Sequence, residues 1–301
     1  MPTPSLQQAR RHSDQQRSLQ VAALLAIRKL FSRGAKPSIP QIAATAGRYQ
    51  GASALISAGT VASFADDPSP STLAQPFIGV SSFGFPLTEP IIATIDARVP
   101  APVEALPDPW WDDARAFMAD LEQLLLSEIA DAGRTASQTE FVSRPEWTNY
   151  VRMLTAPSCD RCTILAGRIY RDLEAFQRHP QCDCVMVPVT SWQDAHDEGL
   201  VSSPQEAFDK GLVTGLSAAD TQAIEDGADI GKVVNAKRGI TTVDTFGRRV
   251  KATTAGTTNR AAWRRQNPTR LVRLRPESIY AFADDRADAI RLLRLYGYLN
   301  G

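Results

Sequence analysis

Apolar residues recur at helical spacing near the start of the chain and predict two helices. The first covers about residues 5–32, where Leu19 and Leu30 share one face and no Pro or Gly interrupts the pattern. The second begins near Ser38, a residue type that caps helices, and ends near residue 64. Residues 1–64 are therefore predicted to form a helical hairpin.

The hydrophobic pattern changes after this hairpin. Residues 65–109 contain nine prolines, which exclude a long helix, so the segment is predicted to be a linker or an extended arm. A short helix near residues 91–97 is the exception that the prolines allow. From residue 110 to residue 132 helical periodicity returns, and Gly133 is expected to end that helix.

The centre of the chain, residues 137–188, has no long periodic segment. We expect a helix near residues 145–154 and short strands at residues 168–170 and 185–187. The last third of the chain is predicted to be helical, with helices at residues 203–210, 217–226 and 230–237 and two more within residues 276–298.

The predicted fold class is α+β and mainly α-helical. It combines a helical N-terminal hairpin, a small centre with short strands stapled by Cys and His residues, and a basic, helical C-terminal region. The predicted segments are residues 1–64 for the hairpin, 65–109 for the Pro-rich linker or arm, 110–192 for the core with the Cys/His cluster, and 193–301 for the C-terminal region.

The composition is that of an ordinary globular protein, with 43% hydrophobic and 22% charged residues in a chain of 301, long enough for two domains. No run of 18 apolar residues occurs, so no membrane partner is expected. The N-terminus lacks the small-residue cleavage site of a signal peptide. This favours synthesis in the cytoplasm, where cysteines stay reduced or bind metal.

The charges are unevenly distributed, although 33 basic and 33 acidic residues cancel. Residues 232–275 hold twelve Lys or Arg residues and a single acid, Asp244. Such a segment suits a polyanion, but a solvated face, or one that docks on the acidic remainder of the chain, explains it equally. Trp263 in this segment either stacks on an exposed base or anchors a loop to the core. The candidate DNA-binding residues are Lys237, Arg238, Arg248, Arg249, Lys251, Arg260, Arg264 and Arg265.

Four cysteines form two close pairs. Cys159 and Cys162 make a C-x-x-C sequence, and after nineteen residues Cys182 and Cys184 make a C-x-C sequence, with His179 just before it. Thiolates and an imidazole at this spacing are typical ligands of structural Zn²⁺. A single intervening residue restricts how two thiolates reach one ion, so the choice between His179 and Cys184 as fourth ligand stays open. Unmetallated buried thiols and two disulfides are the alternatives.

No catalytic motif accompanies the cluster. The glycine-rich phosphate loops, the Gly-x-Ser-x-Gly elbow and the His-Glu-x-x-His motif are absent. Glu174 or Asp183 can be proposed as the acid-base group of an open, hydrolytic metal site, but a four-thiolate site is normally closed. The chain is therefore not expected to be an enzyme. His12 and His196 stand alone in the sequence and are expected at the surface.

Several longer runs of sequence surround the cluster. They are TEFVSRPEWTNYVRMLTAPSCDRCTILAGRIY, FQRHPQCDC, AIEDGADIGKVVNAKRG, AGTTNR and RLRPESIYAFADDRADAIRLLRLYGYL. Together these runs resemble the Mu F-like minor head proteins of tailed phages, in the form found in phages of actinobacteria. The resemblance covers residues 110–301, and the shared core of the family falls on Cys159, Cys162, His179, Cys182 and Cys184.

The resemblance implies a structural role in the phage virion. A protein of this family is expected to be a minor capsid component in the head interior or at the portal vertex, synthesised in the host cytoplasm and needed for head morphogenesis. The implied partners are the portal protein, the major capsid or scaffold proteins and packaged DNA. The alternative function is a DNA-binding or DNA-escort protein delivered with the genome, and a metal-dependent enzyme is the third.

Overall fold

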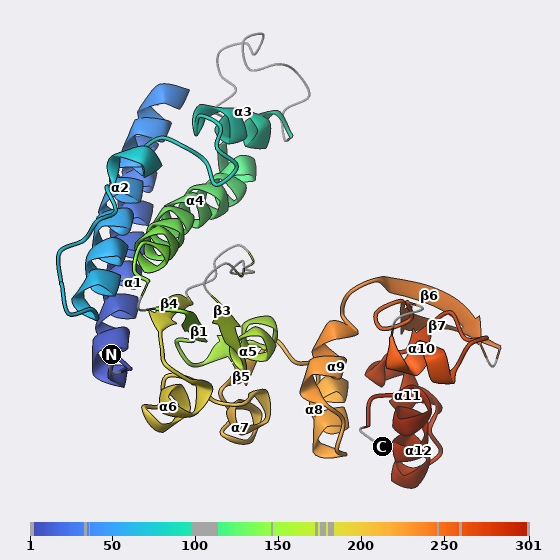
Figure 1. Ribbon diagram of the computed structural model, residues 1–301. Coiled ribbons are helices and arrows are strands. Elements are labelled where there is room, and N and C mark those ends of the chain that lie inside the picture. The colour runs from blue at the N-terminus through green and yellow to red at the C-terminus, as the bar shows by residue number, and fades with distance from the viewer. Residues whose placement is uncertain are drawn as a thin grey trace. The chain divides into compact units, whose positions relative to one another are not determined.

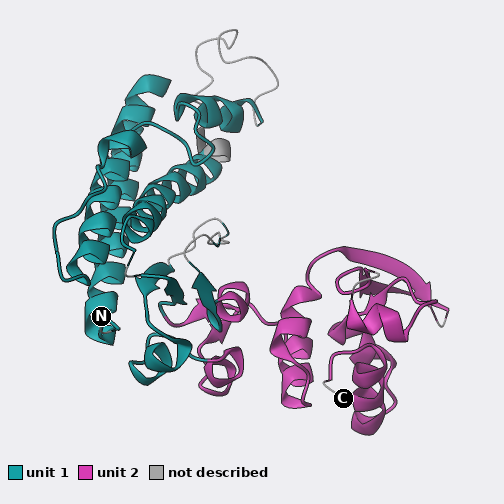
Figure 2. Ribbon diagram, in the orientation of Figure 1, with its two compact units in different colours: residues 1–155, 166–202 teal, residues 156–165, 203–301 magenta. Residues whose placement is uncertain are grey.

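The computed structural model describes residues 3–32, 35, 37–97, 114–145, 147–171, 174, 179, 184–245, 247–258 and 261–299, without the side chains of residues 114–117. Within these ranges the chain forms twelve α-helices and eight β-strands (Figure 1). They divide between two compact units, Met1–Thr155 with Ala166–Ser202, and Ala156–Leu165 with Ser203–Gly301 (Figure 2). The prediction of a mainly helical α+β protein is confirmed.

Three long helices build the first unit: α1 (Leu6–Leu30), α2 (Ile39–Ser63) and α4 (Ala114–Val142). The predicted helical hairpin is confirmed, since α1 and α2 cover the expected ranges. A capping box, in which a Ser side chain and a Gln side chain each bond the other's backbone, starts both α1 and α2. The apolar faces of the helices meet α3 (Thr88–Asp96) in one core, which includes Ile27, Ile42, Ile91, Leu121 and Leu125.

Several residues of the proline-rich segment are hydrogen-bonded to the long helices, and others pack on them. A 3-10 turn, η2 (Gln75–Phe77), contacts α2. Glu140 of α4 is fully buried and accepts hydrogen bonds from the backbone N–H groups of Ser71 at 2.9 Å and Thr72 at 2.8 Å. Residues 98–113, which include the last part of the predicted arm and the start of the predicted helix, lie outside the described residues.

The expectation that Gly133 ends its helix is wrong, because α4 continues to Val142. Gly133 instead lets α2 and α4 approach each other closely. A Cβ atom at this position would collide with Ser53 Oγ and lie 2.8 Å from Ser57 Oγ. A single glycine in a sequence does not distinguish a helix end from such a contact. The small side chains of α2 and α4 that pack together in this contact are Ala54, Ala58 and Ala136.

A small antiparallel sheet follows α4, with the strand order β3-β1-β4. The predicted strands are confirmed as β3 (Ile169–Arg171) and β4 (Val185–Pro188). The helix expected near residues 145–154 is wrong, because β1 (Asn149–Met153) occupies that segment and pairs with both other strands. Its residues are buried on both faces of the sheet, so pairing with distant strands outweighs the local sequence pattern. The short helix α6 (Trp192–Asp197) packs on this sheet through Ala195.

The second unit is mainly helical. The helices expected at residues 203–210, 217–226, 230–237 and within 276–298 are confirmed. Their shared core includes Val233, Ile279, Leu293 and Tyr298, all fully buried or nearly so. The helices are α7 (Pro204–Asp209), α8 (Ala218–Glu225), α9 (Ile230–Asn235), α10 (Ala262–Gln266), α11 (Pro276–Phe282) and α12 (Arg286–Leu295).

A β-hairpin in the second unit was not predicted. β6 (Ile240–Thr245) and β7 (Arg248–Thr253) pair antiparallel along their whole length, and β8 (Arg273–Leu274) extends the sheet. The sequence does carry a signal, because β-branched residues alternate between exposed and half-buried positions in β6 and Gly247, with φ of 70°, lies in the turn. The sequences of these strands contain so many polar residues that they look like the sequence of a solvated loop.

We expect opposite effects of alanine at two glycines of the long helices. Gly133→Ala should lower the free energy of unfolding by about 1–3 kcal/mol, because the added methyl group overpacks the contact with Ser53. Gly59→Ala should raise it by up to about 1 kcal/mol, because a Cβ at Gly59 meets no atom within 4 Å and alanine favours the helix. Thermal unfolding of both variants checks this. Equal effects of the two substitutions would contradict the close contact of α2 and α4.

Candidate metal centre

The C-x-x-C sequence lies where a short strand leads into a helix. Cys159 ends β2 (Ser158–Cys159), and Cys162 is in the first turn of α5 (Asp160–Ala166). The strand is held in place because β2 pairs with β5 (Val213–Thr214). The backbone N–H of Cys162 donates to Cys159 Sγ at 3.3 Å.

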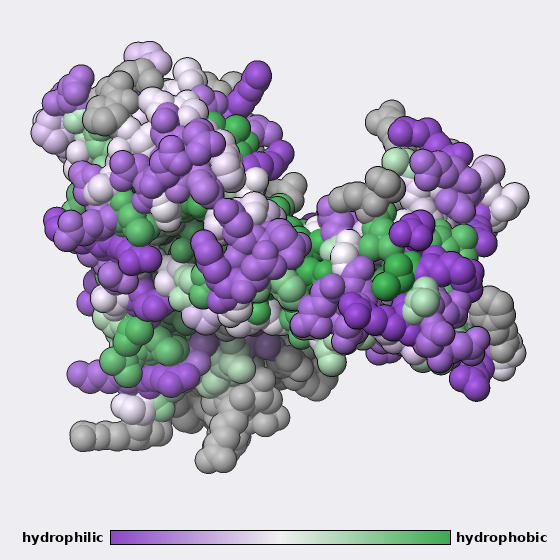
Figure 3. All heavy atoms as spheres, turned by 90° about the horizontal axis from the view of Figure 1, so that it is seen from below, coloured by the Kyte–Doolittle hydropathy of each residue, from purple (hydrophilic) through white to green (hydrophobic). Residues whose placement is uncertain are grey.

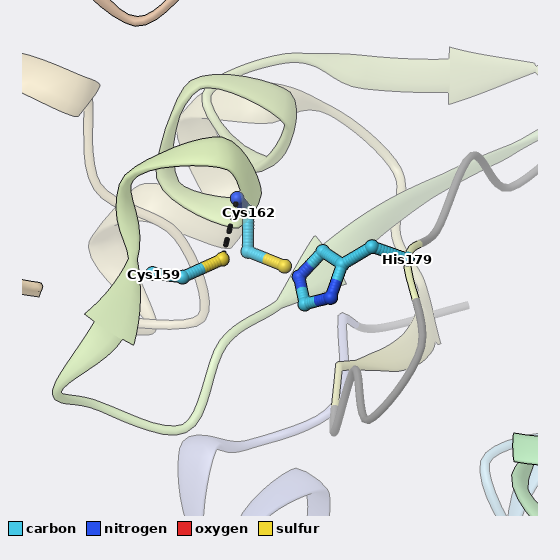
Figure 4. Close-up of side chains that lie close together, drawn as sticks. All are labelled: Cys159, Cys162 and His179. Carbon is cyan, nitrogen blue, oxygen red and sulfur yellow. Dashed lines mark hydrogen bonds between the residues drawn. The ribbon is translucent and has the colours of Figure 1, made fainter. Parts of the chain in front are cut away.

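Cys159, Cys162 and His179 bring their ligand atoms together. One ligand atom from each of the three side chains lies within 4.8 Å of the other two. Figure 4 shows the side chains pointing toward one another. Cys162 is buried, while Cys159 and His179 are partly buried. Two thiols and an imidazole are a donor set that suits a divalent transition metal, so this group can hold a metal ion.

The second cysteine pair of the predicted ligand set behaves differently. Cys182 lies outside the described residues. Cys184 is described but does not belong to the group of Cys159, Cys162 and His179. It is 2% exposed and lines a cavity of about 20 Å³ together with His12. Among the described residues it is therefore His179, and not Cys184, that accompanies the C-x-x-C pair.

His12 is buried, so the expectation of a surface position is wrong. It is 3% exposed, and its Nε2 atom lies 3.3 Å from Ser57 Oγ. Burial lowers the pKa of His12 to about 4, so the imidazole is neutral at neutral pH. Gln16, one turn further along α1, donates to Ser57 Oγ at 3.0 Å and to the Ser53 carbonyl at 3.2 Å. Sequence reasoning missed these residues because this face of α1 is polar and yet buried.

Lys237, one of the candidate DNA-binding residues, is bound to acids of the second unit. Its Nζ atom donates to Asp160 Oδ2 and to the Gly215 carbonyl, and lies 3.4 Å from Asp220 Oδ2. Asp220 is 1% and Asp160 is 9% exposed. The lysine charge is thus compensated within the chain. Because Asp160 directly follows Cys159, Lys237 also fixes the turn that carries the two thiols.

Several other candidate DNA-binding residues gather on the β6–β7 hairpin. Arg248, Arg249 and Lys251 of β7 are exposed, and so is Arg238 just before β6. Arg249 lies opposite Asp244 in the strand register. Exposed side chains in this position contribute little to stability, and their charge faces the solvent.

The candidates near α10 have different surroundings. Arg264 is half-buried, and its Nη1 atom donates to the Arg270 carbonyl at 2.9 Å. Arg265 is exposed on α10, and Arg260 lies outside the described residues. Trp263 is 8% exposed and its indole N–H donates to the Leu295 carbonyl at 3.0 Å, which confirms it as an anchor of α10.

Two arginines of the basic segment are buried. Arg273 is 5% exposed, its Nε atom donates to the Tyr296 carbonyl at 2.7 Å, and its guanidinium carbon lies 4.4 Å from the centre of the Tyr298 ring. Burial lowers the pKa of Arg273. Arg275 is 8% exposed and pairs with Glu277 at 3.2 Å. The charge excess counted in the sequence therefore overstates the charge at the surface.

Exposed apolar side chains occur in small groups. On the face drawn in Figure 3, hydrophilic and hydrophobic residues are interspersed. The most exposed large apolar residues described are Phe83 at 80%, Leu271 at 70% and Leu73 at 69%. Within the described ranges, no helix combines the length and the apolar composition needed to cross a membrane.

One comparison with known proteins gives a match. A protein-family model described as VG15 protein matches residues 90–210, less than half of the chain. The matched segment contains α4, the β3-β1-β4 sheet and the three residues of the candidate metal centre. The match indicates a viral protein of the phage type. No curated protein and no solved structure matches the chain.

We expect bound metal in the purified protein, measured by elemental analysis per chain. Cys159→Ser and Cys162→Ser should each abolish stoichiometric metal, because each removes one ligand of the group. Cys184→Ala should keep the metal, because Cys184 is not part of the group. A chelator should lower the thermal midpoint of the wild type and leave that of Cys159→Ser unchanged, since metal binding stabilises the folded state. Metal loss in a folded Cys184→Ala variant would contradict this assignment.

Proposed function

We propose that the chain is a structural minor capsid protein that associates with the portal and acts in phage head morphogenesis. The observation that carries the proposal is the family match over residues 90–210, because the matched segment holds the candidate metal centre. The runs that flank the cluster, and their resemblance to Mu F-like minor head proteins, give the proposal its specific form. The partners proposed with it are the portal protein and the major capsid or scaffold proteins.

In this proposal the metal is a structural Zn²⁺ ion. Thiolate and imidazole ligands suit Zn²⁺, and an ion bound at the C-x-x-C turn joins segments that short strands alone hold weakly. β2 and β5 have only two residues each. A metal ion that only stabilises the fold needs no open coordination position and no acid-base group. We therefore propose that the protein is not an enzyme.

The proposed location is tested in phage particles. The chain should sediment with purified heads and crosslink to the portal protein, since a portal-associated component is retained at that vertex. Immunogold labelling of opened particles should place the label at one vertex. Absence of the chain from mature heads and from procapsids would overturn the proposal. Uniform labelling of the shell would contradict the portal association alone.

Exposed arginines on the hairpin favour a second function, the binding of packaged DNA. Arg248 and Arg249 are exposed next to the turn of the hairpin, and Arg238 is exposed at its other end, just before β6, so all three side chains can reach a phosphate backbone. DNA binding of this kind does not depend on base sequence and weakens with salt. It is compatible with the structural role, because a protein inside the head faces the genome.

Substitution of these arginines tests DNA binding. The triple variant Arg238→Gln, Arg248→Gln, Arg249→Gln should lose most binding in gel shifts at low salt, and its salt dependence should fall by about three charges. A matched control replaces three other exposed basic residues, Arg10, Arg11 and Lys29, with glutamine and should bind as the wild type does. Equal loss in both triple variants would show a nonspecific charge effect and count against a role of the hairpin.

A further inference from the structure

His12 belongs to a group of polar side chains that are buried between α1 and α2. Both His12 and Gln16 of α1 contact Ser57 of α2, and Gln16 also accepts a hydrogen bond from Ser53 Oγ at 2.7 Å. All four side chains are more than nine-tenths buried. Because water does not compensate for a change of charge in such a place, protonation of one of these groups acts directly on the packing of α1.

His12 also borders a small cavity that α4 and β4 line from the other side. Its volume is about 20 Å³, and its lining includes Arg134 of α4, Met186 of β4 and Cys184 just before β4. A cavity of this size holds about one water molecule. It cannot hydrate an imidazolium ion as bulk water does, so the site favours the neutral imidazole.

The elements packed against α1 bring positive charge to this cavity. Arg134 is partly buried, and its Nη1 atom donates to Asp131 Oδ1 at 2.9 Å, so these two charges compensate each other. Arg152 of β1 is fully buried and lies beside Met186 in the strand register. A proton on His12 would therefore add a positive charge near two arginines, and the charge of Asp131 is already shared with Arg134.

The remaining charged groups near His12 face the solvent. Arg11 and Asp14, its neighbours on α1, are exposed. The one charged residue of α2, Arg48, is exposed as well. These side chains are hydrated, so they do little to offset a charge inside the cavity.

The first half of α1, residues 5–17, contacts the β3-β1-β4 sheet as well as the long helices. Ala9 shares a hydrophobic core with Val151 of β1 and Val187 of β4. Ser13 Oγ lies 2.6 Å from Thr155 Oγ1, just beyond β1. Since His12 is buried among these contacts, its ring reaches water only when residues 5–17 move away from their neighbours.

We propose that His12 is an acid-sensitive switch: the neutral ring holds residues 5–17 on α2, α4 and the β3-β1-β4 sheet, and protonation releases them. The proposal rests on the burial of His12, on the small cavity that it shares with Arg134, and on the contacts of residues 5–17 with two different parts of the unit. It is independent of the proposed capsid role and adds a conformational response to the first unit.

The direction of the pH dependence follows from the pKa of His12 in the two states. Burial lowers the pKa to about 4 in the packed state, whereas the ring in water has its ordinary pKa of 6.5. The packed state is therefore fully favoured above pH 6.5 and loses stability as the pH falls from 6.5 toward 4. For a single proton, the equilibrium constant for opening should rise about tenfold between about pH 7.5 and pH 5.5.

Hydrogen exchange of the full chain, measured by mass spectrometry, tests the switch. After correction for the intrinsic pH dependence of exchange, residues 5–17 of the wild type should be about tenfold less protected at about pH 5.5 than at about pH 7.5. His12→Gln keeps a polar side chain without a titrating group, so this difference should disappear. His196→Gln, the matched control at a partly exposed histidine, should respond as the wild type does.

A second variant tests the charge in the cavity. Arg134→Gln removes a positive charge and leaves Asp131 as a partner for an imidazolium ion, so the acid response of residues 5–17 should be smaller than in the wild type. An unchanged response in this variant would overturn the cavity as its origin.

The ring resonances of the histidines give a measurement in the wild type itself. The chain has three histidines, and His179→Gln and His196→Gln each remove one resonance, so the third belongs to His12. The His12 ring should stay neutral while residues 5–17 are protected. A ring that titrates with the ordinary midpoint of about 6.5, in molecules whose residues 5–17 stay protected, would overturn the proposal.

Two results of the exchange experiment would also overturn it. One is equal protection of residues 5–17 in the wild type at both pH values. The other is an acid response that persists in His12→Gln but disappears in Cys159→Ser, because that result would assign the response to His179 and the loss of metal.

Discussion

The close contact between α2 and α4 determines the geometry of the first unit. The helices meet at Gly133, where the missing side chain leaves room for the serines of α2, and small residues continue this contact. The other parts of the unit depend on it. Gln50 and Glu128, one from each helix, hold the loop of residues 78–86 by hydrogen bonds, and Ser57 contacts the buried His12. A larger side chain at Gly133 would therefore disturb helix packing and also the position of a loop that is distant in sequence.

The second unit has a different constraint, because its short strands and helices leave acidic side chains buried. Asp220 is almost fully buried, and a buried carboxylate is unfavourable unless a positive charge lies beside it. Lys237 supplies that charge and contacts Asp160 as well. The turn that carries the two thiols is thus held by an ion pair, by strand pairing and, in the proposed state, by a metal ion. The ion pair and the strand pairing restrict the same few residues, and so they position the two sulfur atoms to bind one metal ion.

Sequence reasoning predicted α1 and α2 well because their signals are local: a capping serine, an apolar pattern at helical spacing and nearby prolines. It failed where contacts between residues far apart in the sequence determine the structure. Residues 149–153 form a strand because β3 and β4 pair with them, and Lys237 is compensated by an acid 77 positions away. The ligand pattern was recognised from spacing, but spacing does not show that Cys184 is buried in a cavity with His12 while His179 joins Cys159 and Cys162. Charge counting found the basic segment and could not separate the buried Arg273 from the exposed Arg248.

The assignment of residues 156–165 to the C-terminal unit bears on how the gene can vary. These ten residues are encoded in the middle of the sequence that folds as the first unit, yet β5 and Lys237 hold them. If two related genes recombined between codons 166 and 203, Asp160 and its turn would come from one parent. β5 and position 237, which contact that turn, would come from the other parent. Asp160, β5 and Lys237 are therefore expected to be inherited together. The two units are compact in space, but neither can be exchanged between genomes as an intact cassette.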